Sequence, residues 1–275
     1  MTTAVDWTVP TVPCPQLSLH GLGLRVDGRT LFDALDLTMR PGELWCVLGP
    51  NGVGKSTLMA VLAGLRHAER GEVRLGDESL ATLSRQRPDL LARRRAYLPQ
   101  AIHDTFSMTV HDAVAVGRHP HLSGWGWSGR DDDAVVAALL EALDLADLAG
   151  RDVLTLSGGE RQRVSLAAVL AQQAPLLLLD EPLAHLDLRH QILVLDTLAR
   201  LTGAGRHTAM LILHDLNLAR RYATHALLMA EDGSCLHGPA DRVLTPAHCS
   251  RALRTPIVAV AQGAHTALIA TDGPT

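Results

Sequence analysis

Short, uninterrupted apolar runs alternate with amphipathic segments along much of this sequence. The runs with the length of a strand buried on both faces are LWCVL, LLLLD and TAMLIL. Helical periodicity occupies residues 160–173, 190–201 and 216–222, so helices and strands alternate through the second half of the chain. Such alternation predicts an α/β protein built on a mostly parallel sheet.

Two further regions differ from that alternation. Residues 31–48 form extended segments around a turn at Pro41 and Gly42, and EVRL and AYLPQ have the pattern of further strands. Residues 106–152 instead combine the acid-rich helical run DDDAVVAALLEALDLADLA with the loop GRHPHLSGWGW. We therefore expect a helical subdomain inserted into the α/β core.

Composition narrows the class of protein. The 275 residues are 47% apolar and 20% charged, which is typical of a globular protein. The formal net charge of −4 argues against nucleic acid as the main partner, because duplex binding usually requires a basic face. The four cysteines lack C-x-x-C and metal-ligand spacing, which favours reduced thiols over zinc; they are Cys14, Cys46, Cys235 and Cys249.

The sequence predicts neither a signal peptide nor a membrane span. The first residues, MTTAVDWTVPTVPCP, lack the basic and apolar regions of a signal peptide, and we expect residues 1–15 to form a disordered tail. The most apolar long segment, Val164–Leu179, is interrupted by Gln172, Gln173 and Pro175. It is also shorter than the roughly 20 apolar residues that a membrane-spanning helix needs.

A glycine-rich loop supplies the strongest local signal for function. GPNGVGKST fits the phosphate-loop pattern G-x-x-x-x-G-K-[ST] and lies between the strand LWCVL and the helical run LMAVLAGL. Its glycines let backbone N–H groups face phosphates, while Lys55 can reach the β- and γ-phosphates and Ser56 can offer a hydroxyl to Mg²⁺. The residues predicted to bind nucleotide here are Gly49, Pro50, Asn51, Gly52, Val53, Gly54, Lys55, Ser56 and Thr57.

Polar residues follow the ends of three apolar strands. Asp180 and Glu181 follow LLLL; Asp180 can hold Mg²⁺, and Glu181 can orient or deprotonate an attacking water. His214 ends another strand at the same edge of the sheet, where a neutral imidazole can donate to a γ-phosphate. Taken alone, an acidic pair often lies in a solvated loop, and a histidine at a strand end is often structural. A single amide such as Gln100 after AYLP can equally have a structural role. Their order around a phosphate loop favours the functional interpretation.

A second feature suited to phosphate is TLSGGERQRVSLA, residues 155–167. Gly158 and Gly159 directly precede a helical run, so they would leave bare N–H groups at a helix N-terminus. A chain with one nucleotide would not need two such sites. The sequence therefore raises the question of what the second site binds.

The order of motifs answers that question by resemblance. The phosphate loop, LPQ, LSGGERQRV, LLLLDEP, AHLDLRHQ and LHDLNLA occur in this order and cover most of the chain. In this order they resemble the ATP-binding subunit of ABC transporters, whereas the phosphate loop alone would also admit kinases and GTPases. In that family two copies pair head to tail, and the signature of each copy closes over the ATP held by the phosphate loop of the other.

The resemblance implies roles for individual residues, with ATP and Mg²⁺ as ligands. It makes Gln100 a ligand of Mg²⁺ and water, joined by Ser56 and Asp180, and it makes His214 the switch histidine beside Glu181. It also implies a P-loop NTPase core with an N-terminal antiparallel β subdomain and an inserted helical subdomain. The nucleotide-binding residues that it adds are the signature residues Ser157, Gly158, Gly159 and Glu160, and Asp187 of the D-loop.

The expected organisation is a single ATP-binding domain. It spans residues 16–275, with a core at 16–100 and 155–230, the helical subdomain at 101–154 and a short C-terminal extension at 231–275. By resemblance the partners are a second copy, membrane permease subunits and, indirectly, a periplasmic substrate-binding protein, with no nucleic acid. The expected location is the cytoplasmic face of the cell membrane.

Two positions depart from the family pattern. Val26 stands where an aromatic side chain usually stacks on adenine, so we expect weaker discrimination between ATP and GTP. The D-loop reads AHLD instead of the commoner SALD, so His185 either contacts the other copy or faces solvent.

The cargo is the least determined feature. GRHPH, EPLAHLDLRHQ and LHDLNLARRYATH resemble importers of iron-siderophores, haem and vitamin B12, with a slight preference for cobalamin or another metal chelate. An exporter subunit, a soluble ABC ATPase and a P-loop kinase are the alternatives, and the kinase would leave LSGGERQRV unexplained. In the GRHPHLSGWGW loop, Trp125 and Trp127 favour a partner contact or packing over a metal site, because H-P-H is a poor ligand spacing.

Overall fold

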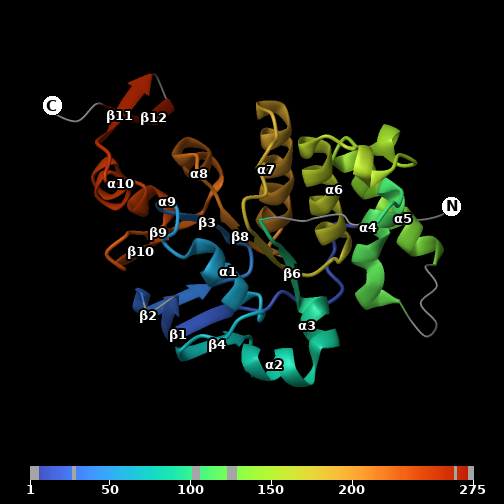
Figure 1. Cartoon of the computed structure of the whole chain (residues 1–275), viewed down its shortest axis with the longest axis horizontal. Helices are drawn as coiled ribbons and strands as arrows, with labels where there is room; N and C mark the ends of the chain where they lie inside the picture. The colour runs from blue at the N-terminus through green and yellow to red at the C-terminus, as the bar shows by residue number, and fades with distance from the viewer. Residues whose placement is uncertain (1–5, 27–28, 101–105, 123–128, 263–264, 272–275) are drawn as a thin grey trace.

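The computed structural model describes residues 6–26, 29–100, 106–122, 129–262 and 265–271. Within these residues a central sheet has an antiparallel sheet against one face and helices against the other (Figure 1). Trp125 and Trp127, for which the sequence predicts a partner contact or packing, lie outside the described residues.

The central sheet has six strands in the described part of the chain. All neighbouring pairs are parallel except β9 with β10 at one edge. In spatial order the strands are β10 (Cys235–Pro239), β9 (His225–Met229), β3 (Leu44–Leu48), β8 (Thr208–Ile212), β7 (Leu176–Leu179) and β6 (Arg95–Leu98). The three apolar runs noted above form β3, β7 and β8, and these strands are buried along their whole length because both faces of the sheet are covered.

Alternate residues of these strands belong to two separate cores. In β7, Leu176 and Leu178 pack toward the antiparallel sheet, whereas Leu177 and Leu179 pack toward the helices. This division follows from the pleat of a strand, which points successive side chains to opposite faces. The sheet is thus a rigid wall whose strand ends can hold a site in place.

The antiparallel sheet covers one of these faces. Helix α1 (Lys55–Leu62), which follows the phosphate loop, contributes Leu58, Met59 and Leu62 to the core shared with this sheet. The Arg-rich stretch before β6 forms two short helices, α2 (Leu80–Gln86) and α3 (Pro88–Arg94). The strands, in spatial order, are β2 (Arg29–Met39), β1 (Leu17–Val26), β4 (Arg70–Leu75) and β5 (Glu78–Ser79).

The helical subdomain leaves the core and returns to it at one place. Val110 N–H donates to Arg151 O over 2.9 Å, and Val153 N–H donates to Met108 O over 3.0 Å, so its two ends lie side by side. The helices of this part are α4 (Val110–Ala115), η1 (Val116–His121), α5 (Arg130–Ala142), η2 (Ala146–Leu148), η3 (Val153–Thr155) and α6 (Gly158–Ala171). They form the end of the molecule opposite the C-terminal hairpin (Figure 1).

The remaining elements follow α6 and complete the core. Asn217 joins the C-terminal hairpin to α8: its Nδ2 donates to Leu268 O over 3.2 Å and its Oδ1 accepts from Leu268 N–H over 2.7 Å. These elements are α7 (Leu188–Gly203), α8 (Leu216–Tyr222), α9 (Ala240–Val243), α10 (Pro246–Leu253), β11 (Ile257–Gln262) and β12 (His265–Ala270).

Two predicted helices begin earlier than their apolar periodicity indicates. The helix expected at 160–173 begins at Gly158, and the one expected at 190–201 begins at Leu188. Each start is set by an N-cap, Ser157 or Asp187, whose side chain accepts a backbone N–H of the first turn. Capping, rather than hydrophobicity, fixes where these helices start.

The expected disordered tail over residues 1–15 is wrong for residues 6–15. Trp7 is only 9% exposed and belongs to the core on the helical side of the sheet. Gln173 Nε2 donates to Val9 O over 3.0 Å, and Thr11 N–H donates to Gln173 O over 3.3 Å. A buried indole and satisfied backbone groups offset the entropy of ordering this Pro/Thr-rich segment.

The helices in the described part of the chain include none that is both long and apolar enough to cross a membrane.

Candidate nucleotide site

The phosphate loop connects β3 to α1 and has backbone conformations that only glycine adopts easily. Gly49 and Gly54 have φ angles of 152° and 105°. A Cβ atom on Gly49 would lie 2.4 Å from Met229 O, and one on Gly54 would lie 2.4 Å from Leu31 Cδ1. The loop therefore wraps closely against β9 and the β1–β2 hairpin, and this closeness explains both glycines.

Lys55 lies at the mouth of this loop. Its side chain Nζ donates to Gly49 O over 2.7 Å and to Pro50 O over 2.8 Å, and the residue is only 6% exposed. Burial lowers the pKa of Lys55, and the nearby carboxylates of Glu181 and Asp180 act against that shift. An ammonium held on two carbonyl oxygens can exchange them for phosphate oxygens at little conformational cost.

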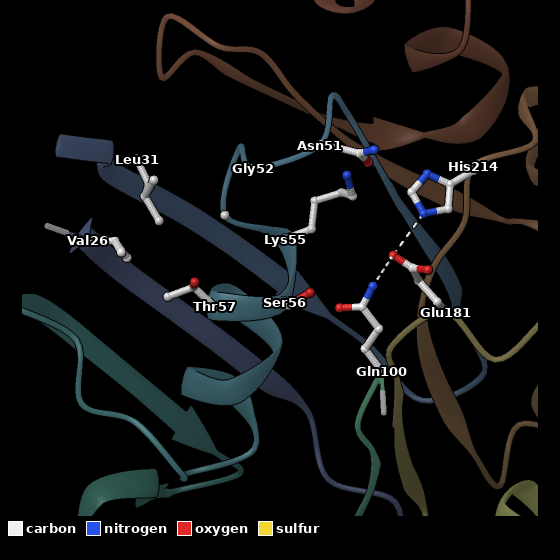
Figure 2. A pocket seen from close by; sticks show the side chains of 11 residues that line it. Val26, Leu31, Asn51, Gly52, Lys55, Ser56, Thr57, Gln100, Glu181 and His214 are labelled. Carbon is white, nitrogen blue, oxygen red and sulfur yellow. Dashed lines mark hydrogen bonds and ion pairs between the residues drawn. The ribbon is translucent and has the colours of Figure 1, made fainter. Parts of the chain in front are cut away.

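A cavity of about 600 Å³ opens in front of the loop, which is large enough for a nucleotide. Figure 2 shows Lys55 and Ser56 facing Glu181, Gln100 and His214 across this cavity. The lining residues are Val26, Leu31, Asn51, Gly52, Gly54, Lys55, Ser56, Thr57, Gln100, Glu181 and His214. Leu31 was not among the residues predicted for the site, although it lies in the strand region that contains Val26.

Val26 and Leu31 form the apolar part of this lining, at the end away from Glu181 (Figure 2). Both are aliphatic, so this wall offers hydrophobic contact to a base and no aromatic stacking. The described residues that line the cavity include no aromatic ring other than the imidazole of His214.

Asp180 has the polar environment expected of a cation ligand. It is 1% exposed, its carboxyl group hydrogen-bonds the Ser56 hydroxyl, and its Oδ1 has no hydrogen-bond partner among the described residues. Burial raises the pKa of Asp180 because it removes water from the charged form, and the Ser56 hydrogen bond and the charge of Lys55 act against this shift. An orphaned buried carboxylate oxygen beside a hydroxyl fits a hard cation such as Mg²⁺.

Glu181 lies between Gln100 and His214. Gln100 Nε2 donates to Glu181 Oε1 over 3.0 Å, and His214 Nε2 lies 2.9 Å from the same oxygen (Figure 2). The backbone of Glu181 has φ 51°, a left-handed conformation that a glutamate rarely adopts and that often marks a functional site. A carboxylate fixed in this way, facing the phosphate loop, can accept a proton from a water on the γ-phosphate.

The signature forms a separate group of donors. Ser157 and Glu160 make a capping box: Ser157 N–H donates to Glu160 Oε2 over 2.8 Å, and Glu160 N–H donates to Ser157 Oγ over 3.3 Å. The first backbone hydrogen bond of α6 comes from Arg161 to Ser157 O. The N–H groups of Gly158 and Gly159 thus have no acceptor within the helix and point along its positive end.

The signature packs against the D-loop of its own chain. A Cβ atom on Gly159 would lie 2.9 Å from His185 O, and one on Gly158 would lie 3.5 Å from the His185 side chain. His185 has φ 63° and is exposed, so its imidazole covers the signature and also reaches solvent. The exposure of His185 agrees with the solvent-facing alternative, and a contact with the other copy stays a prediction.

The predicted residues therefore fall into two groups. The phosphate-loop residues, Gln100, Asp180, Glu181 and His214 surround one cavity or its immediate floor. Neither the signature nor Asp187 is among the residues that line that cavity in the described part. Sequence reasoning also missed Gln162, whose Nε2 donates to Glu181 O over 3.2 Å; its place two residues after Glu160 in an acid-and-arginine run gave no signal.

A mostly parallel sheet with a phosphate loop after β3, and with Glu181 across the cavity from that loop, is the arrangement of an ATP-binding cassette. The family model "ABC transporter" matches residues 32–184, which is more than half of the chain. The chain belongs to the ABC transporter family.

Curated relatives support the same placement. A hemin import ATP-binding protein, HmuV, of Streptomyces coelicolor is 42% identical over 254 residues, covering 90% of this chain and 87% of the relative. The iron(3+)-hydroxamate import ATP-binding protein FhuC of Bacillus subtilis is 35% identical, covering 84% of each chain. The cobalamin import ATP-binding protein BtuD of Halobacterium salinarum is 40% identical; the match covers 84% of this chain and 56% of that protein.

A solved structure extends the likeness to three dimensions. A metal-chelate type ABC transporter in an inward-facing conformation contains a chain that matches with a TM-score of 0.81 and 27% identity. The match covers 94% of this chain and 98% of that one. An ABC cassette in its ADP conformation, at 22% identity and a TM-score of 0.69, shares the fold.

Proposed function

We propose that this chain is the ATP-hydrolysing subunit of a membrane importer for a metal chelate and that it works as a head-to-tail pair of identical copies. The observation that carries the proposal is the separation of two phosphate-binding groups in one chain. The phosphate loop and Glu181 line the cavity. Gly158 and Gly159, whose N–H groups have no acceptor within α6, are not among the described residues that line it. A second copy, turned head to tail, would bring its signature over the open cavity.

Within the cavity, the chain's own residues would bind and orient ATP. Lys55 would transfer its two hydrogen bonds from carbonyl oxygens to phosphate oxygens. Ser56, Asp180 and Gln100 would hold Mg²⁺, which neutralises charge on the phosphates when it is bound. The orphaned Oδ1 of Asp180 supports this assignment.

For hydrolysis, we assign Glu181 as the group that orients the attacking water and accepts its proton. Gln100 and His214 hold one carboxylate oxygen, so the other oxygen remains available to a water. His214, released from Glu181, can donate to the γ-phosphate as negative charge moves toward the leaving group. The Gly158 and Gly159 N–H groups of the second copy would stabilise the same γ-phosphate, so hydrolysis would require closure of the pair.

Coupling to a membrane partner fits the position of the helical subdomain. Gln100 is followed directly by the subdomain, so a shift of this side chain toward the nucleotide can move the helices that follow. We place the chain on the cytoplasmic face of the cell membrane, bound to permease subunits that receive cargo from a substrate-binding protein. The Asp187 N-cap and the signature would lie at the interface between the two copies.

The cargo is the finer part of the proposal. Relatives with 42–45% identity carry hemin in their names, and others carry cobalamin or iron-hydroxamate. These cargoes are all metal chelates, and haem is the first to test. An exporter subunit and a soluble ABC ATPase remain the competing functions, because the direction of transport depends on the membrane partner.

The test is reconstitution of the chain with its permease and binding protein in proteoliposomes. We expect ATP-dependent uptake of one chelate among haem, ferric hydroxamate and cobalamin, and no uptake with Glu181→Gln. Robust ATP hydrolysis without uptake of any metal chelate would contradict the importer assignment. Export of a chelate from preloaded vesicles would favour the exporter.

A further inference from the structure

The segment from Glu181 to Asp187 is fastened at its first residue to helix α6 of the same chain. Gln162 Nε2 donates to Glu181 O over 3.2 Å. Glu181 has the left-handed φ of 51°, so this hydrogen bond fixes the direction of an unusual peptide. Gln162 therefore holds the backbone that carries the carboxylate, whereas Gln100 and His214 contact the carboxylate itself.

The last residue of the segment is fastened through a histidine. Asp187 Oδ1 accepts from His190 N–H over 2.9 Å and lies 2.8 Å from His190 Nδ1. On the other side of the ring, His190 Nε2 lies 3.4 Å from Asp144 Oδ2. The imidazole is 16% exposed, whereas the side chains of Asp144 and Asp187 are 51% and 66% exposed, so the bridge positions the ring through its geometry and adds little stability.

Asp144 is itself anchored to α6. Arg163, the neighbour of Gln162, is 7% exposed, and its Nη1 donates to Leu143 O over 2.8 Å and to Asp144 O. Asp144 has φ 57°, so these bonds hold a tight turn at the end of α5. Arg189 Nη2 adds a contact of 3.2 Å to Asp144 Oδ2. The bridge thus runs from Arg163 through Asp144 and His190 to Asp187.

The middle of the segment has little freedom of its own. Ala184 N–H donates to Glu181 O over 3.1 Å, and Leu186 N–H donates to Leu183 O over 3.3 Å, so the chain is wound into consecutive turns. The His185 carbonyl oxygen lies against Gly159 at the start of α6. A displacement of α6 would therefore move the whole segment instead of stretching it.

We propose that Gln162 and His190 are positioning residues that make Glu181 respond to the nucleotide bound at the signature of its own chain. The inference rests on the proposed head-to-tail pair, in which the signature and Glu181 of one chain serve two different ATP molecules. A shift of α6 caused by one γ-phosphate would reach the carboxylate that acts on the other. This tie couples the two sites and makes hydrolysis cooperative in ATP.

The test compares Gln162→Met and His190→Ala with wild type in steady-state ATP hydrolysis. Methionine keeps the length and helix propensity of glutamine, and Glu181 O retains its bond from Ala184 N–H. We expect kcat to fall about tenfold and the Hill coefficient to approach one, with monomer affinity for a fluorescent ATP analogue within about twofold of wild type. Ser165→Ala removes another α6 hydrogen bond, to Arg161 O, and should change none of these quantities.

Two outcomes would overturn the positioning role. An unchanged kcat and Hill coefficient would show that the contacts of Gln162 and His190 do not couple the two sites. An equal loss of kcat and nucleotide affinity would show that these contacts have a purely structural role. Glu181→Gln, measured in parallel, separates this inference from the proposed function. If that variant forms no dimer with ATP, the head-to-tail pair fails; if it forms one while Gln162→Met behaves as wild type, only the positioning role fails.

Discussion

The phosphate-loop half and the signature half of this chain differ in how their polar groups are paired. Around the loop, Lys55 rests on backbone carbonyls and Asp180 keeps a buried oxygen without a described partner. At the signature, the Ser157–Glu160 capping box pairs the two side chains with backbone N–H groups, and the N–H groups of Gly158 and Gly159 have no acceptor within the helix.

This difference indicates that the phosphate-loop half binds nucleotide and that the signature half contributes to catalysis. The loop half is a concave cavity with charges that a ligand would complete, so it can bind nucleotide in a single chain. The signature half is a rigid, exposed helix start with no cavity of its own in the described lining, so it can contribute only when another molecule presents a phosphate to it. Substitutions in the phosphate-loop half should therefore lower nucleotide affinity, whereas substitutions in the signature half should lower the rate of hydrolysis.

The largest expected effect comes from Glu181→Gln. Hydrolysis should fall by about 10²- to 10⁴-fold, because the amide cannot accept the proton of the attacking water. Binding of ATP should persist, and a closed dimer should accumulate in size-exclusion chromatography with ATP and Mg²⁺. A profile that contains only monomers under these conditions would count against the role of Glu181.

Gly158→Asp should separate the halves most sharply. The added carboxylate suits a helix N-terminus but would repel a γ-phosphate, and its Cβ atom would meet only the His185 side chain, at 3.5 Å. We expect hydrolysis to fall by about 10²- to 10³-fold with monomer affinity for ATP nearly unchanged. Gly158→Ala is the matched control and should retain most of the activity. Equal loss of monomer binding in Gly158→Asp would place the signature within the same chain's site.

Lys55→Ala should show the reverse pattern. Removing the ammonium takes away a charge-assisted contact to phosphate, so the affinity of the monomer for ATP should fall by about 30-fold or more. The measurement is a titration with a fluorescent nucleotide. The structure of the signature half should not change, and thermal unfolding without nucleotide can check this. A large fall in melting temperature would mean that the substitution damages the fold.

The smallest expected effect concerns the base. Val26 and Leu31 offer an aliphatic wall, so the affinities for ATP and GTP should differ by less than about tenfold. Val26→Tyr should raise the affinity for both nucleotides, since stacking on a base contributes about 1–3 kcal/mol and every base offers a face to stack on. Competition titrations measure both values. A strong preference for ATP in the wild-type chain would show that other contacts select the base.

Most of the fold could be predicted from the sequence, because the apolar runs that form the central strands are uninterrupted. Apolar runs of strand length predicted β3, β7 and β8, and a motif between strand and helix located the phosphate loop. Helix starts were missed by about two residues, because Ser157 and Asp187 cap the helices before the apolar periodicity begins. Trp7 was missed because burial of one indole in a Pro/Thr-rich segment depends on distant helices.

The candidate site was predictable only where a local motif has its own chemistry. Lys55 and Ser56 follow from a spacing rule, whereas the contact of His185 with Gly159 and that of Gln162 with Glu181 O depend on how distant segments pack. Such contacts between parts far apart in the sequence have no period or motif. They nevertheless decide which groups of one chain respond together.

The central claim is that each site takes its loop from one chain and its signature from the other, and mixing two inactive variants tests it most directly. Equal amounts of Lys55→Ala and Gly158→Asp form mixed pairs in which one site has both defects and the other has neither. About half of random pairs are mixed and each has one intact site of two, so independent sites would give about a quarter of the wild-type rate. Glu181 of the intact site belongs to the Gly158→Asp chain, so the coupling proposed through Gln162 lowers this rate by up to about tenfold, and the mixture should still exceed both of its components. A mixture no more active than its separate components would contradict the account.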